Sequence, residues 1–134
     1  MKVFVTGVAG QLGHDVINEL ASRTSCQPGA FTWTGSDIAP EYNGAMDGTA
    51  VTKAPYVSMD ITDPASVEKV LLEESPDVVV HCAAWTAVDL AEDMEEKVRQ
   101  VNTVGTENIV KAVKKSGCCK TGRLQRWSIF QQIM

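Results

Sequence analysis

Apolar residues gather in four short runs that predict β-strands. The runs cover residues 2–6, 31–34, 56–59 and 78–82. The first two end at a glycine and the third at an aspartate, which are residues that commonly stop strands. The fourth run, Val-Val-Val-His-Cys, is apolar almost throughout. That composition is typical of a strand buried on both faces of a parallel sheet.

Between these runs, apolar residues recur at the three- and four-residue spacing of helices. One helix is predicted over residues 11–23, and a second runs from the Asp63-Pro64 pair, a capping residue followed by proline, to Ser75. A long helical stretch ends the readable pattern. The inward-facing positions of the three helices are Val16, Ile17, Leu20 and Ala21; Val67, Val70 and Leu71; and Val98, Val101, Gly105, Ile109 and Val113. This alternation of strands and helices predicts an α/β fold with a parallel sheet.

Composition narrows the classes of protein that the chain could represent. The 134 residues are 44% hydrophobic and 22% charged, which is typical of one globular domain. The net charge of -5 argues against nucleic acid and against a membrane surface as partners. No apolar run approaches the roughly 20 residues of a membrane span, and the first residues form a strand, not a signal peptide. We therefore expect a cytoplasmic protein with neither kind of partner.

Cysteines and histidines give no sign of a metal site. The four cysteines include an adjacent pair, Cys118 and Cys119, and none forms a Cys-x-x-Cys pattern. We interpret all four, Cys26 and Cys82 included, as reduced thiols. His14 and His81 lack neighbours of metal-ligand type and are interpreted as structural.

A glycine-rich turn between the first strand and the first helix is the strongest motif. It places glycines at Gly7, Gly10 and Gly13 in the sequence T-G-V-A-G-Q-L-G. The first glycine permits a tight turn, the second lets the backbone approach a pyrophosphate, and the third lets the helix pack close to the strand. The N–H groups of Gln11 and Leu12 would then face the phosphates from the helix N-terminus. The pattern predicts a dinucleotide site; the alternative is a purely structural glycine turn.

Asp37 ends the second strand about twenty residues after the turn. A carboxylate at this place accepts hydrogen bonds from the adenosine ribose of a dinucleotide. The alternative is that Asp37 only begins the next loop. The cofactor would be NADH or NADPH, and NADH is favoured because no Arg or Lys between Gly35 and Glu41 could neutralise a 2′-phosphate.

Four segments together resemble the dTDP-4-dehydrorhamnose reductase family of extended short-chain dehydrogenases. They are T-G-V-A-G-Q-L-G at 6–13, M-D-I-T-D at 59–63, P-D-V-V-V-H-C-A-A-W-T-A-V-D-L-A-E-D at 76–93 and V-N-T-V-G-T-E-N at 101–108. The resemblance spans residues 1 to about 117, and A-A-W-T-A-V-D is its most specific part. It implies a Rossmann-type parallel sheet with strand order 3-2-1-4 and helices on both faces. It also implies reduction of dTDP-4-dehydro-L-rhamnose to dTDP-L-rhamnose by a nicotinamide hydride.

The resemblance also implies roles for individual residues. Asp60 and Ile61 would flank the adenine, and Thr86 would face the dTDP-sugar substrate. The pyrophosphate and the nicotinamide ribose would be lined by Ala83, Ala84 and Trp85. The alternatives are close packing for the two alanines and a buried anchor for Trp85. Asn102 could orient the backbone of the site or be an ordinary polar helix residue.

The catalytic Tyr-x-x-x-Lys pair of such reductases is missing, so no catalytic residue is assigned. The only tyrosines are Tyr42 and Tyr56, and neither has a lysine four residues later. The resemblance stops at Gly117, and residues 118–134 show no clear strand or helix pattern. Regrouping the codons allowed for Trp127 to Met134 in the neighbouring frame permits Val-Tyr-Ile-Ser-Thr-Asp-Tyr, which resembles the missing family segment.

We therefore divide the chain into a truncated NAD(P)-binding Rossmann domain, residues 1–117, and an aberrant tail, residues 118–134, that is the product of a frameshift. A sheet ending at its fourth strand would expose an apolar edge, which favours self-association, for example as a homodimer. Two alternatives to a reductase fragment stay open. One is a non-catalytic dinucleotide-binding sensor or interaction module, and the other is a different sugar-nucleotide reductase or epimerase. A further hypothesis is that the chain has no function, which predicts neither nucleotide binding nor cooperative unfolding.

Overall fold

A computed structural model describes residues 1–42, 54–86, 94–116 and 128–129 of the chain. The expectations for Cys118, Cys119 and most of the tail lie outside these residues, as do those for 87–93. Four parallel strands occur where the apolar runs predict them. They are β1 (Lys2–Thr6), β2 (Thr32–Asp37), β3 (Tyr56–Ser58) and β4 (Val78–His81).

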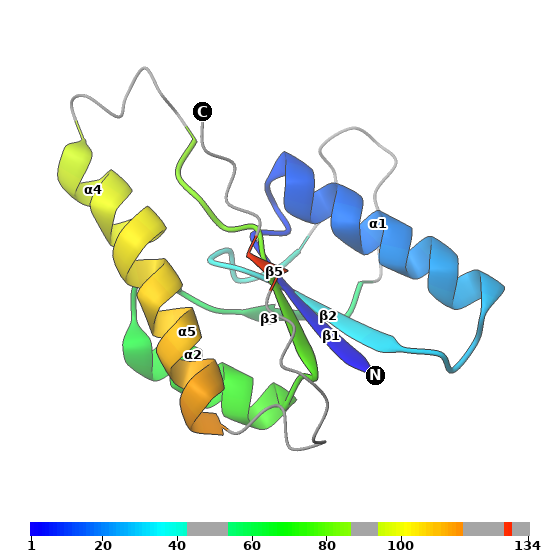
Figure 1. Ribbon diagram of the computed structural model, residues 1–134. Coiled ribbons are helices and arrows are strands. Elements are labelled where there is room, and N and C mark those ends of the chain that lie inside the picture. The colour runs from blue at the N-terminus through cyan, green and yellow to red at the C-terminus, as the bar shows by residue number, and fades with distance from the viewer. Residues whose placement is uncertain (43–53, 87–93, 117–127, 130–134) are drawn as a thin grey trace.

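The sheet has the order β3-β2-β1-β4-β5, so the predicted order of the first four strands is confirmed (Figure 1). The carboxyl ends of the strands meet at one edge, because Thr6 of β1 is in register with Ser36 of β2 and His81 of β4. The expectation that β4 forms the edge of the sheet is wrong. Residues Ser128–Ile129 form β5, which pairs in parallel with Val80 and His81. A two-residue strand is too short to show the alternation from which strands are predicted.

Helices cover both faces of the sheet, as predicted. Helix α1 (Gln11–Cys26) lies on one face, and α2 (Pro64–Glu74) and α5 (Thr106–Ser116) pack together on the other (Figure 1). The long predicted helix is not uniform. It consists of α4 (Glu95–Arg99), a π-helical segment η1 (Gln100–Gly105) and then α5. Such π segments are rare and often occur at functional sites.

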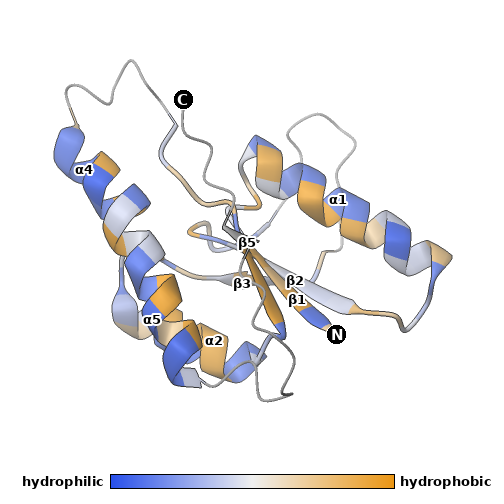
Figure 2. Ribbon diagram, in the orientation of Figure 1, coloured by the Kyte–Doolittle hydropathy of each residue, from blue (hydrophilic) through white to orange (hydrophobic). Residues whose placement is uncertain are grey.

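Alternation along β1 explains the two-sided core. Val3 and Val5 pack with Ile17 of α1 and Trp33 of β2, whereas Phe4 packs on the opposite face with α2 and α5. Figure 2 shows apolar segments on α1, α2 and α5, the three helices that contribute buried residues to the core. Because successive side chains of a strand point to opposite faces, one buried apolar strand holds both helical layers.

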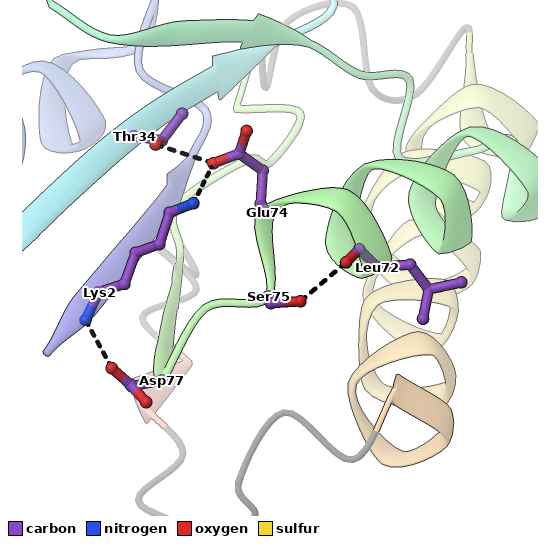
Figure 3. A network of polar contacts seen from close by, with 6 residues as sticks. All are labelled: Lys2, Thr34, Leu72, Glu74, Ser75 and Asp77. Carbon is purple, nitrogen blue, oxygen red and sulfur yellow. Dashed lines mark hydrogen bonds and ion pairs between the residues drawn. The ribbon is translucent and has the colours of Figure 1, made fainter.

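The amino ends of the strands are joined by a polar network (Figure 3). The Lys2 N–H donates to Asp77 Oδ2 over 2.7 Å. The Lys2 Nζ and the Thr34 hydroxyl both lie 3.0 Å from Glu74 Oε2. These contacts connect β1, β2 and the end of α2 at the edge opposite the glycine turn, so they stabilise the fold without taking part in the site described next.

Candidate functional site

The glycine turn after β1 has the geometry that the motif predicts. Gly7 has φ +74°, and a Cβ on it would lie 2.5 Å from the Ala83 nitrogen. A Cβ on Gly13 would lie only 2.2 Å from Gly7 O, so α1 packs directly against the turn. Gly10 is the N-cap of α1 and offers no side chain to the first N–H groups of the helix. These groups are therefore available to an anion at the positive end of the helix dipole.

Asp37 lies across the turn at the end of β2. Its Oδ2 accepts a hydrogen bond from the Ala9 N–H over 3.0 Å, and its Oδ1 accepts one from the Ile38 N–H over 2.7 Å. The carboxylate is thus held against the glycine turn by two backbone donors. Each carboxylate oxygen has further lone pairs, so the group can still accept hydrogen bonds from ribose hydroxyls.

The segment after β3 is fixed by short-range and long-range contacts. Asp60 Oδ1 accepts hydrogen bonds from both the N–H and the hydroxyl of Thr62, over 2.8 and 2.7 Å. The buried Asn108 side chain donates to Ile61 O over 3.0 Å. Gly105 of η1 packs so closely on Ile61 that a Cβ would lie 2.7 Å from Ile61 Cδ1. Of the predicted adenine-flanking pair, Ile61 is therefore held by contacts with α5 and η1, and Asp60 by its hydrogen bonds with Thr62.

The segment after β4 is clamped by one amide side chain. Asn102 Oδ1 accepts from the Trp85 N–H over 2.7 Å, and Asn102 Nδ2 donates to Trp85 O over 3.2 Å. Of the two interpretations offered for Asn102, orientation of this backbone is confirmed. The helix that carries Asn102 is in its π-helical part here. The wider π-helical turn therefore coincides with the position from which the Asn102 side chain reaches the backbone of Trp85.

Titratable groups beside the clamp are uncharged at neutral pH. Burial lowers the pKa of His81 to about 4 and raises the pKa of Cys82 to about 11. His81 is consequently a neutral imidazole and Cys82 a protonated thiol that is a poor nucleophile. Both tyrosines lie outside the cleft described next, and burial raises the pKa of each. Neither has the lowered pKa that a general-acid tyrosine activated by lysine would show.

A cleft of about 610 Å³ opens at the carboxyl ends of the strands. It is lined by eight residues that the sequence predicted for the cofactor site: Gly7, Gly10, Asp37, Asp60, Ile61, Ala83, Ala84 and Trp85. The predicted residues Gln11, Leu12 and Gly13 belong to the first turn of α1 and do not line it. Thr86 is exposed and also lies outside the lining.

The sequence reasoning missed several residues that line this cleft. They are Thr6, Ala9, Ser36, Ile38, Met59, Thr62, Cys82, Lys97, Gln100 and Val101. Most of them are next to a predicted site residue in the sequence, so they could have been predicted as its neighbours. Lys97 and Gln100 had no such signal because they come from α4 and η1. Lys97 is the one cationic side chain among the described residues of the lining.

Two polar atoms of the lining residues have no partner. Ser36 Oγ and Trp85 Nε1 are buried and make no hydrogen bond within the part of the chain that the structure describes. Unsatisfied buried polar groups are uncommon in folded proteins and point to a missing ligand or water.

The described residues contain no group of three or more His, Cys, Asp or Glu side chains suited to a metal ion. Among the same residues, no helix combines the length and apolarity needed to cross a membrane.

Comparison with known proteins identifies the family to which the chain is related. Residues 1–119 match the family model described as RmlD substrate binding domain. A dTDP-4-dehydrorhamnose reductase of Streptomyces griseus is 38% identical over 89 residues, which cover 66% of this chain and 29% of that protein.

Two solved structures share the fold of this chain. A dTDP-4-dehydrorhamnose reductase of Bacillus anthracis in complex with NADP has a TM-score of 0.65 at 28% identity, covering 87% of this chain and 33% of that one. A UDP-glucose 4-epimerase of Thermus thermophilus in complex with NAD shares the fold, with a TM-score of 0.71 at 24% identity and coverage of 88% and 35%. The chain spans about a third of the length of these relatives.

Proposed function

The chain belongs to the RmlD substrate binding domain family, and from this premise we propose that its cleft binds a nicotinamide dinucleotide. The observation that carries the proposal is the glycine turn. It combines a left-handed Gly7, a backbone contact at Gly13 too close for any side chain, and an α1 N-terminus without a side-chain cap. These are the features that a pyrophosphate requires of a binding turn.

The residues present fit such a cofactor along the whole cleft. The adenosine ribose would bind Asp37, and the adenine would lie against Asp60 and Ile61. The pyrophosphate would lie on the glycine turn, and residues 83–85 would line the nicotinamide end. The unpartnered Trp85 Nε1 and Ser36 Oγ provide polar atoms at which a bound molecule or its waters could be held. The bound nicotinamide would supply a hydride for reduction of a carbonyl group.

We further propose that the natural reaction is the reduction of dTDP-4-dehydro-L-rhamnose to dTDP-L-rhamnose. The second candidate is another sugar-nucleotide reaction, such as a 4-epimerisation, because the relatives include a dTDP-L-rhamnose 4-epimerase and a UDP-glucose 4-epimerase. The described residues supply binding and orientation but no tyrosine placed as a proton donor in the cleft. The chain as it stands is therefore expected to bind the dinucleotide without reducing a sugar nucleotide.

The cofactor preference follows from Asp37. A carboxylate beside the ribose hydroxyls repels a 2′-phosphate, so NADH should bind more tightly than NADPH. Calorimetric titration of the 134-residue chain with each dinucleotide tests this. We expect saturable binding of NADH, and an Asp37→Asn variant that narrows the difference between the two cofactors. If neither dinucleotide binds, the proposed function is refuted.

A further inference from the structure

A hydrogen-bonded relay passes behind the cleft and centres on His81. This side chain is 3% exposed at the end of β4. Its Nδ1 lies 2.7 Å from the Thr6 hydroxyl of β1, and its Nε2 lies 3.1 Å from the Thr106 hydroxyl of α5. His81 and Thr106 do not line the cleft. A buried imidazole with both nitrogens engaged connects three elements that are far apart in the sequence.

The direction of each hydrogen bond follows from the partners. The Thr106 hydroxyl donates to Asn102 O over 2.8 Å, because a carbonyl can only accept. Thr106 Oγ1 must then accept from His81, so the proton of the neutral imidazole is on Nε2. His81 Nδ1 therefore accepts from the Thr6 hydroxyl, and Thr6 Oγ1 in turn accepts from the Ala83 N–H over 3.4 Å.

Both ends of the relay hold the same wall of the cleft. At one end, Thr6 receives the N–H of Ala83. At the other end, the backbone that Thr106 fixes belongs to Asn102, whose side chain binds both polar backbone groups of Trp85. The wall 83–85 is thus tied to β1 and to η1 through one imidazole. Chains of aligned hydrogen bonds inside a protein strengthen one another, so loss of one link weakens the rest.

We propose that His81 and Thr106 are positioning residues for the dinucleotide. They hold the wall 83–85 at the correct distance from the glycine turn without touching the bound molecule. The inference rests on the proposed dinucleotide site. The close contact between Gly7 and Ala83 makes that distance important, because a small shift of the wall changes the space above the turn.

Thr106→Val is the sharpest perturbation, since it keeps the shape of the side chain and removes only the hydroxyl. NADH should bind about five- to tenfold more weakly to this variant, the effect of about one net hydrogen bond. Thr106→Ser keeps the hydroxyl and should restore the affinity of the unaltered chain. Thr103→Val, at an exposed position of η1 three residues before Thr106, is the matched control and should leave the affinity unchanged. A thermal melt of each variant shows which protein is folded during the titration.

A second measurement needs no variant. Nitrogen-15 NMR of the unaltered chain should show His81 with its proton on Nε2, protected from exchange, and a shift of this signal when NADH is added. A proton on Nδ1, or a Thr106→Val variant that binds as tightly as the unaltered chain, would overturn the inference while leaving the dinucleotide site intact. Equal weakening by Thr106→Ser and Thr106→Val would also overturn it. Failure of the unaltered chain to bind NADH would remove the proposed function and this inference together.

Discussion

The third glycine of the turn offers the clearest quantitative prediction. In the Gly13→Ala variant, the new Cβ would lie 2.2 Å from Gly7 O, 2.6 Å from Gly7 C and 2.9 Å from Val8 Cα. An ordinary carbon–oxygen contact is roughly 3.3 Å, so the helix and the turn must separate by about 1 Å. All three neighbours are backbone atoms, and no side chain can rotate away to relieve the overlap.

The energetic consequence has two opposing parts. Overpacking of this kind costs about 1–3 kcal/mol, and contact with backbone alone places Gly13→Ala near the upper end. Alanine favours the helical state over glycine by about 1 kcal/mol, which offsets part of that cost. We therefore expect a net loss of about 2 kcal/mol in the free energy of unfolding. For a domain of this size the midpoint of thermal unfolding should fall by roughly 6–8 °C.

Urea and thermal unfolding followed by circular dichroism measure this loss. Gly10→Ala is the matched control, because its Cβ would meet its nearest neighbour, Gly7 O, at 3.3 Å. That variant should stay within about 1 kcal/mol of the unaltered chain. A Gly13→Ala protein as stable as the unaltered chain, or more stable, would refute the close packing of α1 on the turn.

Three further predictions concern charge. The free energy of unfolding should rise as the pH increases from about 4 to 6.5, because burial lowers the pKa of His81 to about 4 in the folded state. In this pH range the unfolded state binds a proton at His81 and the folded state does not. His81→Asn should flatten this slope in urea unfolding measured at several pH values. Glu74→Gln should lower the free energy of unfolding by about 1 kcal/mol at low salt, since Glu74 accepts from both Lys2 and Thr34, and the loss should shrink at about 1 M salt. Lys97→Gln should weaken NADH binding about threefold in calorimetry, whereas the exposed Lys114, which does not line the cleft, should tolerate the same change.

Much of the site was predictable because parallel strands end at one edge of a sheet. Asp37, Asp60 and Ala83 each lie at or just after the end of a predicted strand, and the structure brings all three to the cleft. The motif also predicted the tight turn at Gly7 and the close helix packing at Gly13, because these depend on a short segment with its own local geometry. Local pattern predicted the glycine turn and Asp37, whereas Asp60, Ile61 and residues 83–85 were predicted from the family resemblance.

Contacts between distant residues could not be predicted in the same way. His81 was interpreted as structural, and only the structure shows it between Thr6 and Thr106, which lie 75 and 25 residues away in the sequence. The π segment also lacked a signal, because a change of backbone hydrogen-bond pattern within a helix leaves no mark in the spacing of apolar residues. Such features arise from the tertiary arrangement and not from any periodicity of the chain.

The most direct test of the account is amide NMR of the 134-residue chain with and without NADH. We predict that shift changes on adding NADH concentrate in three segments that meet at the cleft, residues 7–13, 60–62 and 83–85. The polar network around Glu74 at the opposite edge should stay unchanged. Spectra that do not respond to NADH, or changes confined to other surfaces, would contradict the claim that this cleft binds a nicotinamide dinucleotide.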